Sequence, residues 1–398
     1  MPKLAAKEYC TGCTACASIC PKGCITLEKD GNGFICPVID KHRCAECRLC
    51  EKRCPCIHPL KHADHMPKAY AVYSKDETIR LSSSSGGIFT ELAKVVLQQG
   101  GAVFGAAYNE QFDVVHIGVE TEDELPKLRG AKYAQSDLSG VFTQIRQKLA
   151  MGQTVLFSGT PCQVGGLKAF LHEDYSNLLT VDFVCHSVPS PVAWREYVKY
   201  RAEKDNNGEL PTMINLRSKK TGWSRYQYSN LFKYKDGVIH TAKSNESLYM
   251  KLFVNGYISR ESCDNCQFKG YARVSDLTLG DFWGIWETDP EMDDDKGTSA
   301  VLCQTERGRE LLQRISERLV MKAVSLEDVS RQNPALLRAS PPNERRSEAL
   351  ELIRNGKISA CEAWFIPQKP SFHKRMQQLA GRVLRKIYRC CFQSNGRK

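Results

Sequence analysis

The cysteines near the N-terminus of the chain are spaced so that their thiolates could bind metal. Of 19 cysteines in 398 residues, eleven lie between Cys10 and Cys56. Two runs share one pattern, in which four cysteines are separated by two, two and three residues and followed by a proline: Cys10–Pro21 and Cys44–Pro55. The N-terminal sequence lacks the apolar stretch of a signal peptide, so we expect thiolate–metal bonds here and not disulfides.

This spacing is typical of bacterial ferredoxins with two [4Fe–4S] clusters, in which the fourth cysteine of each run binds the other cluster. Three cysteines separated by two residues each can bind three corners of a cubane from one tight loop. The fourth, after a longer step, lies outside that loop and faces the partner cluster. We therefore predict two ligand sets: Cys10, Cys13, Cys16 and Cys54 for one cluster, and Cys44, Cys47, Cys50 and Cys20 for the other. Zinc sites use paired Cys-x2-Cys knuckles instead.

Other residues near the two runs are harder to assign. Six cations flank the runs, and they either offset the negative charge of the clusters and raise their potentials or form a solvated face: Lys22, Lys41, Arg43, Arg48, Lys52 and Arg53. Three further cysteines are left over, and we expect them to be packing residues: Cys24, Cys36 and Cys56.

A second group of cysteines lies in the middle of the chain. Residues 154–158, 164–171 and 178–184 follow the pattern strand, amphipathic helix, strand, which predicts two parallel neighbouring strands. Cys162 and Cys185 each follow one of these strands, at the edge where α/β sheets place ligands. With Cys263 and Cys266 they form either a four-thiolate site, for a third [4Fe–4S] cluster or a zinc ion, or a set of ordinary buried thiols.

Two segments have features of a phosphate or cofactor site. Ser82–Gly87 contains four hydroxyls and two glycines and leads into a helix predicted over 87–98, although serine is also the usual helix N-cap. Leu128–Ser136 contains the cations Arg129 and Lys132 and the aromatic Tyr133, which also fit a solvated loop.

The remaining chain suggests an α+β protein. Strands are predicted at 69–73, 102–108 and 114–120, a hairpin around the turn at Asp236-Gly237, and mostly helices after Glu306. We expect three parts: a ferredoxin-like domain with two [4Fe–4S] clusters over 1–66, a larger mixed α/β flavin-binding domain over 67–330, and a helical C-terminal region over 331–398. No stretch is long and apolar enough to span a bilayer.

These motifs, in this order, resemble the family of coenzyme F420 hydrogenase/dehydrogenase beta subunits over about residues 4–330. The resemblance rests on the ferredoxin repeat and on further segments of the body: Ser84–Thr90, Gly130–Ser136, Ser158–Gln163, Cys185-His186, Cys263–Cys266 and Ser275–Gly284. It implies an iron–sulfur flavoprotein with FAD in the α/β domain and a third cluster on the four body cysteines. The flavin contacts that it implies are Ser84, Ser85, Gly86, Gly87, Lys132, Tyr133, Ser158 and Thr160. Asp281 either closes this site or belongs to a turn, and His186 either relays protons or is structural.

We therefore expect a cytoplasmic oxidoreductase. FAD would exchange a hydride with an organic substrate, deazaflavin-like or other, and the clusters would exchange single electrons with a redox partner protein or small molecule. One alternative is a subunit that only relays electrons, and another is a membrane-surface accessory protein with structural clusters. The sequence identifies no catalytic residue, substrate or direction of electron flow.

The basic charge of the chain lies mainly in its tail. Residues 369–398 hold nine Lys and Arg and no acidic residue, against a net charge of +11 for the whole chain, so we do not expect the body to bind nucleic acid. Apolar residues recur at helical spacing from Met376 to Cys391, with cations beside them. This pattern favours either a helix that docks on protein or peripheral contact with the inner face of the membrane.

We predict that the full chain sediments with anionic vesicles more than with neutral ones, because each basic residue near such a surface contributes about 1 kcal/mol. A version that ends at Pro370 is the control and should lose this binding. Equal, negligible sedimentation of both proteins would leave only the docking helix.

Overall fold

The computed structural model describes residues 1–62, 65–225 and 227–366. The described residues up to Ser359 form one compact unit, and those from Ala360 onward belong to a second. The sequence-predicted boundaries at 66 and 330 both lie inside the first unit and remain proposals. The amphipathic helix predicted over 376–391 lies outside the described residues. None of the described helices is long and apolar enough to cross a membrane.

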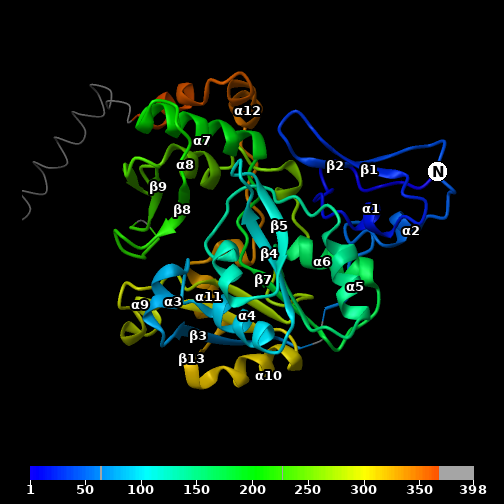
Figure 1. Ribbon diagram of the computed structural model, residues 1–398, viewed down its shortest axis with the longest axis horizontal. Helices are drawn as coiled ribbons and strands as arrows, with labels where there is room; N and C mark the ends of the chain where they lie inside the picture. The colour runs from blue at the N-terminus through cyan, green and yellow to red at the C-terminus, as the bar shows by residue number, and fades with distance from the viewer. Residues whose placement is uncertain (63–64, 226, 367–398) are drawn as a thin grey trace, which may run out of the picture. The chain divides into compact units, whose positions relative to one another are not determined.

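The N-terminal lobe, residues 1–62, consists of two cysteine loops beside a two-stranded sheet. Its elements are α1 (Ala15–Ile19), β1 (Ile25–Lys29), β2 (Ile35–Ile39) and α2 (Leu49–Lys52). β1 and β2 are antiparallel. In Figure 1, α1 lies between α2 and helix α6 (Pro161–Leu171) of the body, and it contacts both.

An eight-stranded mixed sheet organises the body. Its strands are β3 (Lys68–Ser74), β4 (Ala102–Tyr108), β5 (Val114–Val119), β6 (Val155–Gly159), β7 (Leu178–Phe183), β11 (Leu277–Asp281), β12 (Ser299–Cys303) and β13 (Leu319–Val324), in the order β13-β3-β12-β11-β7-β6-β4-β5. The central strands β4, β6, β7 and β11 are parallel neighbours, and the outer pairs are antiparallel. The carboxyl ends of the parallel strands therefore meet at one edge.

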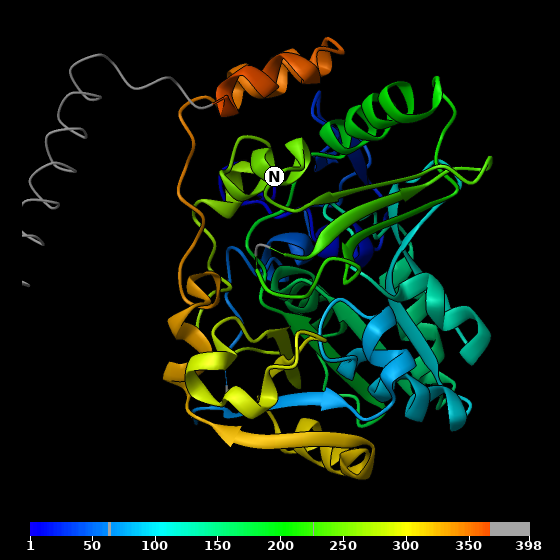
Figure 2. The ribbon, with the colours of Figure 1, turned by 90° about the vertical axis from the view of Figure 1, so that its left-hand side faces the viewer.

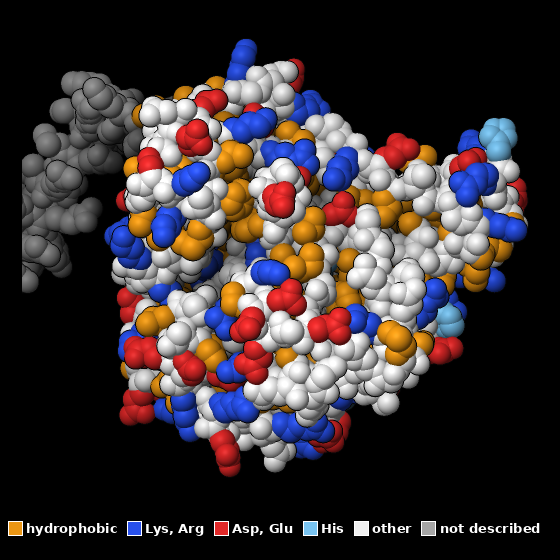
Figure 3. Space-filling view, viewed as in Figure 1, with side chains coloured by type: hydrophobic (Ala, Val, Ile, Leu, Met, Phe, Trp, Pro, Cys, Tyr) orange, Lys and Arg blue, Asp and Glu red, His pale blue; other side chains and the backbone are white. Residues whose placement is uncertain are grey.

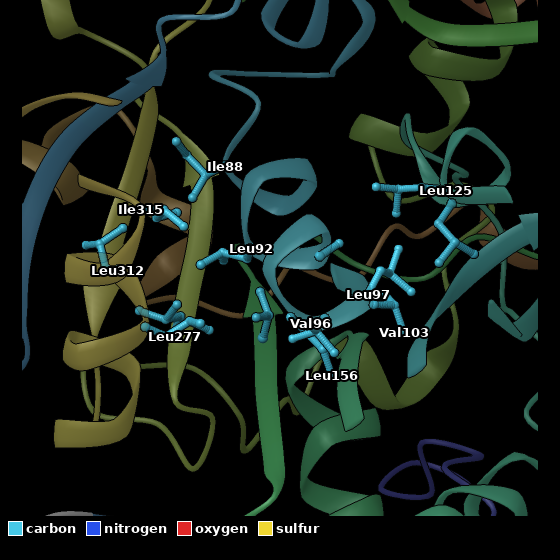
Figure 4. Close-up of a cluster of buried hydrophobic side chains, with 14 of the residues drawn as sticks. Ile88, Leu92, Val96, Leu97, Val103, Leu125, Leu156, Leu277, Leu312 and Ile315 are labelled. Carbon is cyan, nitrogen blue, oxygen red and sulfur yellow. The ribbon is translucent and has the colours of Figure 1, made fainter. Parts of the chain in front are cut away.

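Helices cover both faces of this sheet. On one face α4 (Ile88–Gln98) and α10 (Glu306–Arg314) bury apolar side chains against the central strands, as in the cluster around Leu92, Leu156 and Leu277 (Figure 4). The other face is covered by α5 (Val141–Ala150) and α6, and next to them by α9 (Ile285–Thr288) and α11 (Leu326–Arg331). Ala15 and Cys13 of the N-terminal lobe belong to the α5–α6 core, so the lobe is packed onto the body and not merely tethered to it.

A smaller subdomain begins after strand β7. It contains a three-stranded antiparallel sheet of β8 (Met213–Ser218), β9 (Ser229–Lys233) and β10 (Ile239–Lys243), with α7 (Pro191–Asn206), α8 (Leu248–Val254) and α12 (Arg346–Arg354) (Figure 2). Within it the buried rings of Tyr197 and Tyr249 stack, and Trp194 meets Tyr249 edge to face. The remaining helices are α3 (Glu77–Ser82) and the 3-10 helices η1 (Glu122–Leu128), η2 (Glu261–Cys263), η3 (Pro290–Met292), η4 (Ser316–Arg318), η5 (Pro334–Leu336) and η6 (Ile358–Phe365).

The mixed α/β prediction is confirmed, with the parallel pair β6–β7 and the β9–β10 hairpin as expected. The described part of the region after Glu306 is mostly helical, as expected, and it also contains one strand, because Leu319–Val324 pairs with β3 at the edge of the sheet. Its residues alternate only weakly between buried and exposed positions, as on a sheet edge. The region 205–300 also supplies β11 of the main sheet and the first two residues of β12.

Gly86 is held between two strands of the main sheet. An added Cβ would lie 2.4 Å from Val72 O and 3.0 Å from Ser299 N, both backbone atoms that cannot move away easily. Replacing Gly86 by Ala should therefore lower the free energy of unfolding by about 1–3 kcal/mol. Gly105→Ala is the matched control, because its Cβ would meet only Leu128, at an ordinary 3.5 Å. Thermal unfolding of both variants checks this, and equal stability would contradict it.

Candidate functional site

The first predicted cysteine set lines one concave pocket of the N-terminal lobe. Cys10, Cys13, Cys16 and Cys54 face this space together with the left-over Cys56. The loop that carries them turns sharply, with φ of +68° at Gly12 and +70° at Thr14. Burial raises the pKa of the Cys13 thiol to about 12, whereas hydrogen bonds from Cys56 and the backbone lower that of Cys54 to about 6.

The second set lines another pocket, towards the outer end of the lobe. Cys20, Cys44, Cys47 and Cys50 face it together with Cys24, whose sulfur lies 3.3 Å from that of Cys20. Each set thus draws its fourth cysteine from the other sequence run, the same exchange that the spacing predicts. Cys47 is exposed, unlike the other seven. Among the described residues, no three His, Cys, Asp or Glu side chains converge as they would around a single metal ion.

The four body cysteines are neighbours at the carboxyl edge of the main sheet. Cys162 lies in the first turn of α6, which Thr160 caps in a reciprocal pair of hydrogen bonds with Gln163, and Cys185 lies two residues beyond β7. The Cys162 thiol is buried, which raises its pKa well above the ordinary value. Negative charge on Cys185, Cys266 or Cys263 would raise it further, so the four sulfurs are electrostatic neighbours.

Backbone and cationic groups surround these body sulfurs. Val188 N donates to Cys263 Sγ at 3.3 Å, and Thr160 Oγ1 lies 3.1 Å from Cys162 Sγ. Lys269 Nζ donates to Cys185 O and, at 2.9 Å, to Ala335 O. Burial raises the pKa of Cys185 to about 11, and the charge of Lys269 acts against that rise. The Val188 N–H group and the charge of Lys269 thus offset part of the cost of burying thiolates here.

The serine–glycine segment predicted to contact flavin forms hydrogen bonds with other parts of the protein. Gly86 N donates to Ser299 Oγ at 2.9 Å, and Ser85 Oγ donates to Thr298 O at 3.1 Å. Gly87 has a φ of +90° and precedes α4. The two glycines are therefore explained by close backbone packing and a left-handed turn. Ser84 instead presents its carbonyl oxygen to Arg217 Nη2 at 3.2 Å.

The loop from Leu128 to Ser136 is folded around the Lys132 side chain. Lys132 Nζ donates to the carbonyl oxygens of Lys127, Arg129 and Gly130 at 3.1, 2.7 and 3.3 Å. Burial lowers the pKa of Lys132 to about 7. Lys132, which the sequence suggests as a ligand contact, thus forms its hydrogen bonds with the backbone of its own loop.

A buried histidine joins this loop to the end of β6. His116 Nε2 donates to Ser158 O at 3.0 Å, which leaves Nδ1 to accept from Ser136 Oγ at 2.5 Å. Burial lowers the pKa of His116 to about 4, so the ring is neutral. Ser158 therefore contacts this loop through His116, while Thr160 contacts the body cysteine Cys162.

An ion pair that the sequence did not reveal joins the two predicted flavin segments. Arg217 donates two hydrogen bonds to Asp281, at 2.7 and 2.8 Å, and its guanidinium lies over the rings of Tyr228 and Trp283. The charge of Arg217 acts against the rise that burial causes in the pKa of Tyr133, so the two are neighbours. The motif at 275–284 made Asp281 a candidate, but no motif around Arg217 marks it as the partner of Asp281.

Several buried polar groups around the Leu128–Ser136 loop lack a partner among the described residues. They are Arg129 Nε, Arg217 Nε and Tyr108 OH. Arg129 lies in the loop, Arg217 is beside Tyr133, and the Tyr108 ring lies 5.9 Å from Lys132 Nζ. Buried donors without acceptors are costly, so this loop is where a ligand with acceptor atoms fits best.

This chain is similar to two family profiles and to individual proteins. Residues 69–143 and 152–329 match the profiles described as coenzyme F420 hydrogenase/dehydrogenase, beta subunit, N-terminal and C-terminal. The F component of the F(420)H(2) dehydrogenase of Methanosarcina mazei is 24% identical over 169 residues, which are 39% of this chain and 46% of that protein. An uncharacterized ferredoxin of Methanocaldococcus jannaschii is 41% identical over 49 residues, 12% of this chain and 62% of that protein.

One solved structure, the F420-reducing [NiFe] hydrogenase complex from Methanosarcina barkeri, aligns with 76% of this chain and 94% of its own, at 18% identity and a TM-score of 0.45. The chain thus spans about half the length of the dehydrogenase protein and under two thirds of the ferredoxin that it matches. The two profiles together cover most of the body that holds the Cys162 edge and the Arg217–Asp281 pair. The chain therefore belongs to the family of coenzyme F420 hydrogenase/dehydrogenase beta subunits, which are components of oxidoreductases.

Proposed function

We propose that the protein is an iron–sulfur flavoprotein subunit with three [4Fe–4S] clusters and one FAD. The clusters occupy the three cysteine sets described above, two in the N-terminal lobe and one at the carboxyl edge of the main sheet. FAD exchanges a hydride with an organic donor or acceptor, deazaflavin-like or other, and the clusters exchange single electrons with a redox partner. A flavin suits this position because it converts two-electron chemistry into one-electron chemistry.

The observation that carries this proposal is the grouping of the cysteines. Two runs far apart in the sequence exchange their fourth cysteines, so that each pocket has four thiols in addition to one left-over cysteine. A cubane binds each thiolate through a different iron, so its ligands stand further apart than around one ion. Zinc, with Zn–S bonds of about 2.3 Å, would need a tighter group.

The fit of FAD rests on the unpartnered donors around the Leu128–Ser136 loop. Arg129 and Arg217 could donate to phosphate or ring acceptor atoms, and Tyr133 supplies an aromatic surface beside them. The Ser84–Gly87 segment lies next to this loop, because Arg129 Nη1 is 3.4 Å from Ser82 Oγ. Its glycines, however, have a structural role, so we place the main flavin contacts on the two arginines.

A second candidate function is an electron-relay subunit without substrate chemistry of its own. The internal engagement of Lys132 and of the serine–glycine segment favours it. If an organic hydride donor bleaches the bound flavin under anaerobic conditions, the protein has substrate chemistry of its own and the relay function is excluded. Peripheral membrane contact of the basic tail stays a separate proposal.

We predict about twelve iron atoms per chain after anaerobic purification. Replacing Cys263 and Cys266 together by Ser should lower this to about eight, because it removes two ligands of the body cluster only. Cys36→Ser is the matched control: Cys36 lies in β2, lines neither pocket, and should leave the iron content unchanged. Iron and zinc analysis measures both, and a wild-type protein with about eight irons and one zinc would contradict the body cluster.

We predict about one noncovalent FAD per chain, released by acid denaturation. Arg129→Met should weaken flavin binding about tenfold to hundredfold, because a hydrogen bond to a charged group is worth about 1.5–3 kcal/mol. Arg314→Met, an exposed change on α10, is the control. Fluorescence titration of the flavin-stripped protein gives the two dissociation constants. Equal constants would show that Arg129 does not contact the flavin.

A further inference from the structure

Arg260 is a buried cation at the contact between the N-terminal lobe and the body. Only 4% of the residue is exposed. Its Nε donates to Cys10 O at 2.8 Å, its Nη2 to Ile35 O at 2.9 Å, and its Nη1 to Gln135 Oε1 at 3.3 Å. The guanidinium also lies 5.4 Å from the centre of the Phe34 ring.

The cysteine loop of the lobe is shaped around this guanidinium. A Cβ added to Gly12 would lie 3.2 Å from Arg260 Nη1 and 2.7 Å from Gln135 Nε2. Gln135 in turn donates to Thr11 O at 3.3 Å and accepts from Ile35 N at 2.8 Å. Arg260 therefore fixes the segment between Cys10 and Cys13, two of the four cysteines of the inner set.

The backbone of Arg260 belongs to the body cysteine site. Cys263 N donates to Arg260 O at 3.0 Å, and Arg260 N donates to Val188 O at 2.8 Å. Val188 N in turn donates to Cys263 Sγ. One residue thus connects a loop of the inner set (Cys10, Cys13, Cys16, Cys54) with a loop of the body set (Cys162, Cys185, Cys263, Cys266).

The charge of Arg260 is not balanced by a carboxylate. No ion pair of Arg260 occurs among the residues that the structure describes, although buried Arg80, Arg217 and Arg273 each have an aspartate partner. A buried, unpaired cation is costly. This residue is in direct contact with both sets, through Cys10 O on one side and Cys263 N on the other.

A second contact brings the same two sets together. The Cys13 side chain abuts Gly166 of α6, where an added Cβ would lie 2.9 Å from Cys13 Sγ. Gly166 is one helical turn, about 6 Å along the axis, from Cys162. The inner set is therefore adjacent to the body set on two sides, while the outer set (Cys20, Cys44, Cys47, Cys50) ends at the exposed Cys47. Figure 3 shows this end of the lobe at the surface, with Lys and Arg side chains on it.

We propose that Arg260 is a positioning residue that sets the reduction potentials of the inner and body clusters and fixes the place where electrons cross between lobe and body. This inference rests on the proposed function, because it needs clusters on both sets. An electron that crosses between the body cluster and the inner cluster would oxidise one and reduce the other, with no bond or proton transferred, and the inner cluster would exchange electrons in turn with the outer cluster. A fixed cation stabilises the reduced, more negative form of each neighbouring cluster and raises its potential.

The test is a potentiometric titration of the anaerobic holoprotein followed by electron paramagnetic resonance. Arg260→Met should shift the midpoint potentials of the inner and body clusters to more negative values and leave the outer cluster unchanged. Arg260→Lys, which keeps the charge, should restore most of the shift. Arg48→Met is the matched control, because the exposed Arg48 lines the outer pocket and should affect the outer cluster alone.

The outcomes separate this inference from the proposed function. A wild-type protein without three clusters overturns the proposed function. Three intact clusters whose potentials do not change in Arg260→Met, or all change alike, overturn the role of Arg260. If Arg260→Met and Arg260→Gln lose iron while Arg260→Lys keeps it, the clusters require the charge, which supports the proposal. Loss of iron in all three variants would show a merely structural residue and overturn it.

Discussion

The parallel pairing of β6, β7 and β11 is the constraint on which the site depends. Because these strands run in the same direction, Cys162, Cys185 and Asp281 come to one edge of the sheet. The buried Asp276 side chain secures the β7–β11 pairing, since its carboxylate accepts from Thr180 N at 2.8 Å and from Thr180 Oγ1 at 2.7 Å. Any change in the register of these strands would separate the body cysteines from the arginine–aromatic group around Arg217.

The N-terminal lobe uses the same edge as its docking surface. Its inner cysteine loop contacts α6, and its 30–36 turn contacts α7, where Ser190 Oγ donates to Asn32 O at 2.6 Å. Arg260 reaches from the body into the lobe between these contacts. In the proposed account, the three cluster sites form a line from the sheet edge through the inner set to the outer set. The hydrogen bonds that hold the lobe in place thus also keep this line continuous.

The sequence predicts which cysteines are grouped where the relevant relations are local or follow from strand direction. The exchange of Cys20 and Cys54 between the two runs follows from spacing, and the meeting of Cys162 with Cys185 follows from a parallel β-α-β unit. Arg260 gave no such signal, because its three side-chain partners lie 125 to 250 residues away in the sequence. Gly86, which suggested close approach of a cofactor, also lies against the backbones of β3 and β12, a constraint that the sequence does not reveal. The Arg217–Asp281 pair, 64 residues apart, likewise needs the tertiary fold.

The most direct test of the account is a crystal structure of the anaerobically purified protein with anomalous data collected at the iron edge. The account predicts three iron peaks: one in the pocket of Cys10, Cys13, Cys16 and Cys54, one in that of Cys20, Cys44, Cys47 and Cys50, and one among the four body cysteines, with Arg260 between the first and the third. Iron bound by any other combination of cysteines, or no iron at the body set, would contradict it.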